Sequence, residues 1–182
     1  SADHAMAIVE SSSRVTPAAR GEAAAAAIDV TVLVPVLDEA GTVEELAGRV
    51  ARVLDGLGMA HEIVFVDDGS RDGTSDRVRA ARAADPRVKL VRLRRNFGKA
   101  AALTAGFDVA RGRLVVTMDG DLQDDPDEIP RLLEALEAGP FDLVVWHVDR
   151  ITDLVSEVLA AVAPVTNATT VVLAGGMDKY LP

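Results

Sequence analysis

The chain has 182 residues, a formal net charge of −10 and no cysteine. This length suits one ordinary domain with a real core. The negative charge argues against nonspecific nucleic-acid binding, and the lack of cysteine excludes a disulfide framework and a thiolate metal site. No apolar run is as long as a membrane span and no signal peptide is visible, so we expect a cytoplasmic location.

The positive charges are unevenly distributed along the chain. Of the 19 lysine and arginine residues, 12 lie between Arg71 and Arg113. Such clustering suits a basic patch for phosphate or for an anionic membrane surface. For Arg77, Arg79 and Arg82 the favoured interpretation is the solvated face of a helix.

Strand-like and helix-like segments alternate after a leader, residues 1–27, that contains few large apolar side chains and is expected to be flexible. The alternation predicts βαβ units and therefore an α/β fold, with a mainly parallel sheet and helices on both faces. The right-handed crossover rule brings the loops after the strands to one edge. The predicted elements are strand 30–36, helix 43–57, strand 62–66, helix 75–84, strand 88–93, helix 100–110, strand 114–118, a helix from about 126 to 139 and strand 141–145.

The segment after Arg150 gives a weaker pattern. It predicts an apolar helix over residues 152–163 and a strand over residues 169–173. Unlike the preceding part of the chain, it carries almost no acidic residues in its loops. We therefore expect residues 151–182 to pack loosely or to add only peripheral elements.

An acidic turn follows the apolar run LVVTM of residues 114–118. Four aspartates, Asp119, Asp121, Asp124 and Asp125, repel one another unless a cation neutralises them, and Gly120 lets the backbone turn sharply between Asp119 and Asp121. Ligands of open α/β sheets bind at the carboxyl ends of the strands. An oxygen-only cluster there suits Mg²⁺ or Mn²⁺, with phosphates of a ligand completing the coordination. The alternative interpretation is a solvated turn before an acidic helix start.

A second acidic loop follows the strand of residues 62–66. Asp67 and Asp68 suit hydrogen bonds to a nucleobase or to ribose hydroxyls, and the alternative is a simple Asx-turn. The chain has no GxGxxG after its first strand and no GxxxxGK[ST], which argues against a Rossmann dinucleotide site and a P-loop. Metal and basic side chains would then hold phosphates. The candidates Arg94, Arg95 and Lys99 are explained equally well as ordinary surface charge.

Three ordered segments, VTVLVPVLDEAGTVEEL, EIVFVDDGSRDGT and RRNFGKAAALTAGFDVARGRLVVTMDGDLQDDPDEIPRLLE, resemble family 2 glycosyltransferases of the GT-A fold. The resemblance is closest to the polyprenyl-phosphate sugar transferases, the branch that is similar to dolichol-phosphate mannosyltransferase. It covers about residues 29–150, so residues 28–150 are expected to form a GT-A nucleotide-sugar-binding domain. Residues 151–182 show no match to the family's acceptor half.

The resemblance assigns roles to residues of all three loops. Asp119, Asp121 and Gln123 are the implied metal ligands, and Asp121 has the catalytic role. Two positions depart from the family pattern, because Asp38 stands where Asn is usual and His147 stands near a usual Arg. The implied nucleotide-sugar contacts are Pro35, Val36, Leu37, Glu39, Asp67, Asp68, Lys99, Asp119 and Gly120.

The resemblance implies an inverting transfer of a hexose from a UDP- or GDP-sugar to a polyprenyl phosphate, such as dolichyl or undecaprenyl phosphate. Mg²⁺ or Mn²⁺ would be the cofactor, and the chain would act peripherally on the cytoplasmic membrane face. One alternative is a nucleotide-sugar-binding domain without turnover, which His147 and the unmatched residues 151–182 favour. The other is a nucleotidyltransferase with a similar acidic loop, against which the lack of a glycine-rich, basic loop after the first strand argues. The oligomeric state stays open.

Overall fold

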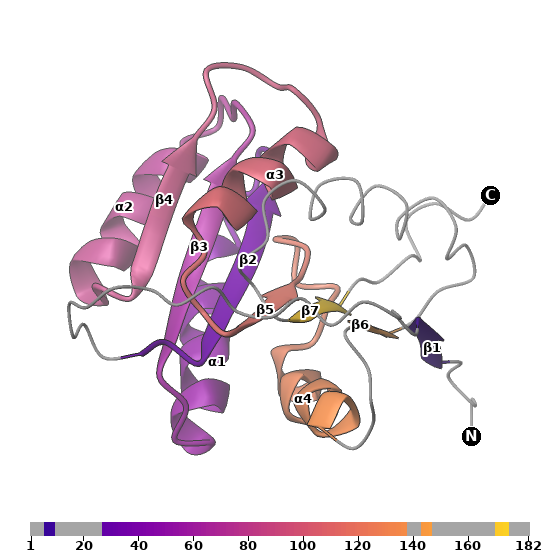
Figure 1. Ribbon diagram of the computed structural model, residues 1–182. Helices are drawn as coiled ribbons and strands as arrows, with labels where there is room; N and C mark the ends of the chain where they lie inside the picture. Colours follow the sequence, from indigo (N-terminus) through magenta and orange to yellow (C-terminus); the bar gives the residue numbers. More distant parts are fainter. Residues whose placement is uncertain (1–5, 10–26, 138–142, 147–169, 175–182) are drawn as a thin grey trace.

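The computed structural model describes residues 6–9, 27–137, 143–146 and 170–174, and these residues build a seven-stranded sheet (Figure 1). The strand order is β1-β6-β7-β5-β2-β3-β4. β1 pairs antiparallel with β6, and the other neighbours pair in parallel. The strands are β1 (Met6–Val9), β2 (Val30–Val36), β3 (His61–Asp67), β4 (Val88–Arg92), β5 (Leu114–Thr117), β6 (Leu143–Trp146) and β7 (Thr170–Ala174), and the helices are α1 (Val43–Gly56), α2 (Thr74–Ala84), α3 (Lys99–Val109), the short 3-10 helix η1 (Pro126–Glu128) and α4 (Ile129–Glu137).

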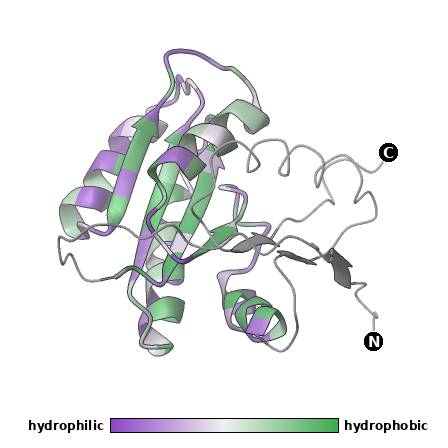
Figure 2. Cartoon of the chain, viewed as in Figure 1, coloured by the Kyte–Doolittle hydropathy of each residue, from purple (hydrophilic) through white to green (hydrophobic). Residues whose placement is uncertain are grey.

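Helices cover both faces of the sheet, as predicted. On one face, Val32 of β2 belongs to a buried core that also contains Leu46 of α1, Val78 of α2 and Leu132 of α4. The next residue along β2, Leu33, points to the opposite face, where α3 packs against β2 and β3. In Figure 2 the central strands are mainly hydrophobic and the helices carry both kinds of residue. The fold is therefore α/β with two helical layers.

β2, apart from Thr31, and the middle of β3, residues 63–66, are apolar because both faces of the sheet are covered. Every residue of β3 is buried, and in β2 the one exception is Pro35, which is partly buried. Proline has no N–H for the ladder, and here it lies one residue before the strand ends. Val36 pairs with Asp67 in the parallel register, so the two strands deliver their following loops to the same edge.

Strands from two flanking segments join this sheet. β1 lies in the leader expected to be flexible, where the sequence pattern predicts no strand. β7 confirms the strand predicted over residues 169–173. The expectation that the tail adds only peripheral elements is wrong for β7, because it lies between β5 and β6. Its run TVVL has the β-branched character of an interior strand, but periodicity does not identify the neighbours of a strand.

The other predicted elements are confirmed with small shifts at their ends. The helix expected from about residue 126 begins as η1 and continues as α4, after the Asp125 carboxylate accepts a hydrogen bond of 3.0 Å from the Asp127 N–H. The predicted helix over residues 152–163 and His147 lie outside the described residues. Within the part of the chain that is described, no helix is long and apolar enough to span a membrane.

Candidate active site

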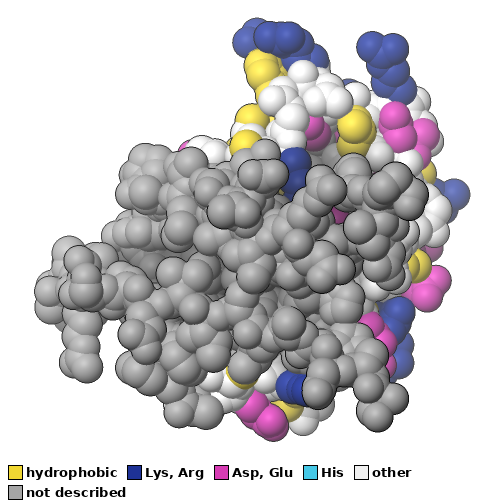
Figure 3. Space-filling model, turned by 90° about the vertical axis from the view of Figure 1, so that its right-hand side faces the viewer, with side chains coloured by type: hydrophobic (Ala, Val, Ile, Leu, Met, Phe, Trp, Pro, Cys, Tyr) yellow, Lys and Arg dark blue, Asp and Glu magenta, His cyan; other side chains and the backbone are white. Residues whose placement is uncertain are grey.

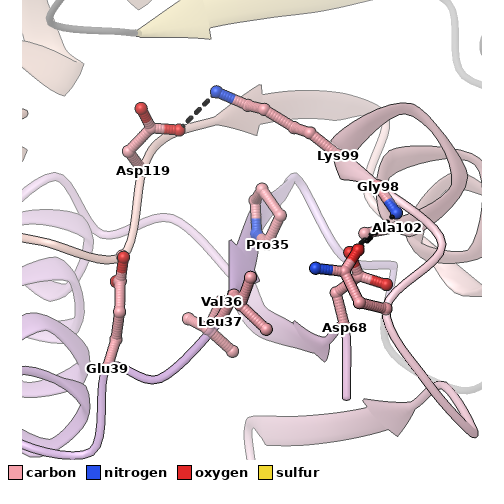
Figure 4. Close-up of a pocket in the computed structure, with 11 residues that line it drawn as sticks. Pro35, Val36, Leu37, Glu39, Asp68, Gly98, Lys99, Ala102 and Asp119 are labelled. Atoms are coloured by element: carbon pink, nitrogen blue, oxygen red, sulfur yellow. Dashed lines mark hydrogen bonds and ion pairs between the residues drawn. The ribbon is translucent and has the colours of Figure 1, made fainter. Parts of the chain in front are cut away.

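A pocket of about 210 Å³ lies at the carboxyl ends of β2, β3 and β5 (Figure 4). The predicted convergence of the loops after the strands is therefore confirmed for the loops that begin at Leu37, Asp67 and Asp119. Asp67, Asp121 and Gln123 are not part of the lining. Of the predicted nucleotide-sugar contacts, the lining contains Pro35, Val36, Leu37, Glu39, Asp68, Lys99, Asp119 and Gly120, and it adds Asn96, Gly98 and Ala102.

The loop after β2 is tied to the loop after β3 by backbone N–H groups. Ser70 Oγ accepts a hydrogen bond of 2.9 Å from the Asp38 N–H, and Thr74 Oγ1 accepts one of 2.9 Å from the Glu39 N–H. In return, the Asp38 carboxylate accepts a bond of 2.7 Å from the Arg71 N–H. An asparagine Oδ1 could accept this bond too, so Asp38 departs from the family pattern without changing the contact.

Asp67 organises the loop after β3 from within. It is fully buried, and its carboxylate accepts hydrogen bonds from the Ser70 N–H at 2.7 Å and from the Ser75 hydroxyl. Burial alone would raise the pKa of Asp67, but these hydrogen bonds outweigh it and hold the pKa below its usual value. The carboxylate therefore stays ionised and fixes the turn, while its predicted contact with the nucleotide stays a prediction.

Asp67→Asn should lower the free energy of unfolding at pH 7 by about 1–2 kcal/mol. The carboxylate accepts one hydrogen bond on each ionised oxygen, whereas the amide has a single, neutral acceptor oxygen. A carboxylate with a lowered pKa in the folded state contributes stability above its unfolded pKa of about 3.9, and this contribution is lost as pH falls through the folded pKa. The difference between wild type and variant should therefore shrink in acid. Urea unfolding at pH 7 and pH 3 measures it, and an equal difference at both pH values would contradict the assigned role.

Asp68 lines the pocket and also holds the next loop in place. One oxygen of its carboxylate accepts the Phe97 N–H at 2.8 Å and the other accepts the Gly98 N–H at 2.9 Å. Gly69 allows this approach, since it has φ +86 and a Cβ there would lie 2.6 Å from the carbonyl carbon of Arg95. The clamp fixes the start of α3 and therefore the position of the first residue of that helix, Lys99.

Lys99 reaches across the mouth of the pocket to the acidic turn after β5. Its Nζ forms an ion pair of 2.6 Å with Asp119, whose side chain is 25% exposed (Figure 4). The Asp119 N–H donates a hydrogen bond of 2.7 Å to the buried Asp124 carboxylate, which holds the turn. A lysine and an aspartate from different loops thus face one another where the three loops meet.

Gly120 is needed because two loops approach each other closely at this point. A Cβ at Gly120 would lie 2.6 Å from Val36 Cγ1 and would overlap the Glu39 carboxylate. The Thr42 hydroxyl donates a hydrogen bond of 2.6 Å to the Gly120 carbonyl. The acidic turn is therefore seated against the loop that precedes α1.

The oxygen atoms that the acidic turn offers are of the kind that hard divalent cations such as Mg²⁺ prefer as ligands. Asp119 and Asp121 offer carboxylate oxygens, and Asp121 Oδ1 accepts the Gln123 N–H at 3.1 Å. Leu122, between Asp121 and Gln123, has the left-handed backbone conformation, with φ +64. Among the described residues, no three His, Cys, Asp or Glu side chains form a group that could hold a metal ion. Two carboxylates would need oxygens of a ligand to complete the coordination, as a diphosphate supplies.

The sequence does not indicate that Asp124 and Thr42 support the site. Asp124 and Thr42 both bind backbone atoms of the turn that carries Asp119 and Gly120. Their residue types are common in turns and at helix starts, so no pattern distinguishes them. The contribution of Asn96 and Gly98 to the pocket could have been found, because both belong to the NFGK segment that begins a helix directly after a strand.

A mainly parallel α/β sheet with acidic loops around a pocket at its carboxyl edge is typical of nucleotide-binding proteins. The model of Glycosyl transferase family 2 matches residues 31–159, which is most of the chain. The chain belongs to glycosyltransferase family 2. This confirms the family that the three sequence segments indicate.

The curated relatives include enzymes named for polyprenyl phosphates. The undecaprenyl-phosphate 4-deoxy-4-formamido-L-arabinose transferase of Aeromonas hydrophila is 43% identical over 116 residues, which cover 63% of this chain and 35% of the relative. The dodecaprenyl-phosphate galacturonate synthase of Rhizobium johnstonii is 41% identical over 125 residues, which cover 68% of this chain and 37% of the relative. The chain thus spans little more than a third of the length of these relatives.

Solved structures of glycosyltransferases confirm the GT-A fold. A mannosyltransferase from Pyrobaculum calidifontis in complex with GDP-Man and Mn²⁺ is 32% identical with a TM-score of 0.55, covering 70% of this chain and 37% of that chain. Glucosyl-3-phosphoglycerate synthase from Mycobacterium tuberculosis in complex with UDP is 26% identical with a TM-score of 0.54, covering 75% and 51%. Both structures contain a nucleotide or nucleotide sugar.

Proposed function

We propose that the chain is the nucleotide-sugar-binding part, residues 28–150, of an inverting glycosyltransferase that moves a hexose from a UDP- or GDP-sugar to a polyprenyl phosphate. The observation that carries the proposal is the pocket in which Lys99 and Asp119 face one another beside Glu39 and Asp68. A cation and carboxylates at one mouth suit a metal-bound diphosphate. The names of the curated relatives support the class of acceptor, and the bound GDP-Man and UDP support the class of donor.

The reaction needs little from the protein beyond positioning and charge. An oxygen of the acceptor phosphate attacks the sugar's anomeric carbon while the bond from that carbon to the diphosphate oxygen breaks, and the electron pair leaves with the nucleoside diphosphate. The acceptor phosphate is ionised near neutral pH, so no general base is required. Asp119, Asp121 and Gln123 would hold Mg²⁺ or Mn²⁺, which when bound supplies Lewis-acid stabilisation of the leaving diphosphate.

Lys99 has a clear part in this scheme. In the structure its ammonium group neutralises Asp119. With a diphosphate and its metal bound, the same ammonium group would pair with the new negative charge, and Asp119 would then be available as a metal ligand. A polyprenyl acceptor lies in a bilayer, so the chain would work peripherally at the cytoplasmic face of a membrane.

A thermal-shift panel of UDP-, GDP- and other nucleotide sugars, with Mg²⁺, with Mn²⁺ and with chelator, tests donor binding. A ligand that binds only the folded state adds about 2.7 kcal/mol of stability when its concentration is 100 times its Kd. The correct donor should therefore raise Tm clearly when the metal is present. Transfer of labelled sugar to undecaprenyl phosphate then separates turnover from binding alone. If no nucleotide sugar raises Tm with either metal, the proposal is wrong.

The nucleotidyltransferase alternative is not favoured, because the family and the curated relatives are glycosyltransferases. Binding of the donor without turnover is the remaining alternative. The transfer assay distinguishes these two candidates, because both predict a Tm increase with donor and metal and only one predicts a labelled lipid.

A further inference from the structure

The loop between β4 and α3 carries an exposed aromatic ring beside two arginines. Phe97 is 45% exposed, and the Arg95 guanidinium lies 4.5 Å from the centre of its ring. Arg94 and Arg95 are exposed and form no ion pair with any described residue. Figure 3 shows Lys and Arg side chains together with hydrophobic ones at the top of the molecule, the end where Figure 1 shows this loop. We call Arg94, Arg95 and Phe97 the basic tip.

The basic tip lies in a cationic stretch of an acidic chain. Residues 86–107 contain six lysines and arginines and no aspartate or glutamate, although the whole chain has a net charge of −10. Arg87, Lys89 and Lys99 are paired with carboxylates from other parts of the chain or from the preceding turn. The positive charge of the tip is not compensated in this way, so it can attract an anionic partner.

The loop that presents the tip is fixed to the body of the protein. The Phe97 and Gly98 N–H groups donate to the two oxygens of Asp68, and Asn96 Oδ1 also accepts the Gly98 N–H at 2.9 Å. The close approach of Gly69 to the backbone of Arg95 holds the other side. A fixed loop loses little conformational freedom when its side chains meet a partner.

We propose that the basic tip docks onto the anionic headgroups of a lipid bilayer. Arginine binds phosphate oxygens with two parallel hydrogen bonds, and aromatic rings favour the interface between headgroups and acyl chains. A nucleic acid suits the tip less well, because Arg95 already covers one face of the ring that a base would stack on. Three side chains are far fewer than the roughly 20–30 residues a side of a stable protein interface.

The position of the tip gives this docking a use, and here the inference rests on the proposed function. Asn96 and Gly98 of the same loop line the pocket, as does Leu37, which is 41% exposed. A bilayer against the tip would therefore adjoin the mouth where Lys99 meets Asp119. A lipid-held phosphate could then approach a bound nucleotide sugar without leaving the membrane surface.

Co-sedimentation of the full chain with vesicles tests the proposal. Wild type should bind vesicles of phosphatidylcholine mixed with phosphatidylglycerol, should bind more weakly as salt is raised, and should bind poorly to pure phosphatidylcholine. Arg94→Gln with Arg95→Gln should lower the partition coefficient about tenfold or more, since each basic residue near an anionic surface contributes roughly fivefold. Phe97→Ser should lower it by roughly threefold to tenfold.

Matched controls remove two arginine charges, or one exposed apolar side chain, from positions outside the basic tip. Arg79→Gln with Arg82→Gln takes two exposed positive charges from α2, and Leu57→Ser removes an apolar side chain that is 44% exposed. Both controls should bind vesicles as wild type does. Failure of wild type to bind, equal losses in the controls, or tighter binding to single-stranded DNA than to anionic vesicles would each overturn the proposal.

Donor binding in the same samples separates this inference from the proposed function. Phe97→Ser keeps the backbone N–H that binds Asp68, and the Phe97 side chain is not part of the pocket lining, so this variant should bind a nucleotide sugar with Mn²⁺ as wild type does. If wild type binds the nucleotide sugar normally but does not bind vesicles, the proposal that the basic tip docks on a bilayer is wrong and the proposed function stands. Vesicle binding that depends on the tip, in a chain that binds no donor, supports the tip and overturns the proposed function. Thermal melting confirms that each variant is folded.

Discussion

Asp121→Asn should weaken nucleotide-sugar binding in the presence of Mn²⁺ by roughly 30- to 100-fold, corresponding to about 2–3 kcal/mol for a lost interaction of a charged group. Thermal stability should not fall. The amide keeps the Oδ1 that accepts the Gln123 N–H at 3.1 Å, and it removes a negative charge that Asp119 repels. Titration calorimetry on wild type and variant, each with Mn²⁺ and with chelator, measures the effect.

Asp127→Asn is the matched control for this experiment. It removes one charge from the same acidic segment, but its side chain is 66% exposed and lies 3.9 Å from Arg49. Donor affinity of this control should equal that of wild type. If wild type and Asp121→Asn bind the donor equally well in Mn²⁺ and in chelator, the acidic loop is a solvated turn and the proposed function loses its central support.

Lys99→Met should change metal affinity and donor affinity in opposite directions. Without nucleotide, the loss of the 2.6 Å ion pair leaves Asp119 available, so Mn²⁺ alone should bind roughly twofold to fivefold more tightly, as expected for a partly exposed pair. With nucleotide sugar, the diphosphate loses a charge-assisted hydrogen bond, and the donor should bind roughly 10- to 100-fold more weakly. Electron paramagnetic resonance of free Mn²⁺ and calorimetry of the donor measure the two quantities.

Arg49→Gln provides the comparison for Lys99→Met. It also removes a positive charge that pairs with the acidic segment, at 2.5 Å from Asp125, but Arg49 does not line the pocket. This variant should leave both affinities close to those of wild type. If Lys99→Met moved the two affinities in the same direction, Lys99 would not exchange between Asp119 and the diphosphate.

The sequence contains much of the architecture because covered parallel strands carry a strong local signal. β2 and β3 appear as continuous apolar runs, and the loops after them must share an edge once the strands are parallel. The convergence of Leu37, Asp68 and Asp119 on one pocket follows from that topology. The order of strands and helices along the chain is sufficient to predict that these loops share one edge.

The finer arrangement depends on tertiary geometry that no local pattern encodes. Asp67 and Asp68 are neighbours of the same type, yet one is buried within its own loop and the other clamps the start of α3. Which carboxylate points which way is decided by partners outside this pair, such as Ser75 for Asp67 and Phe97 for Asp68. The ion pair between Lys99 and Asp119 likewise needs both loops in place before it can be seen.

The insertion of β7 between β5 and β6 has a consequence for how the chain is made. A ribosome delivers β6 before β7, so β5 keeps an unpaired edge of backbone N–H and C=O groups until residues 170–174 emerge. Strands that pair over long sequence separations form slowly, and open apolar edges invite association with other chains. We therefore expect a nascent chain that ends before β7 to depend on chaperones, and its release from them to coincide with the closing of this gap in the sheet.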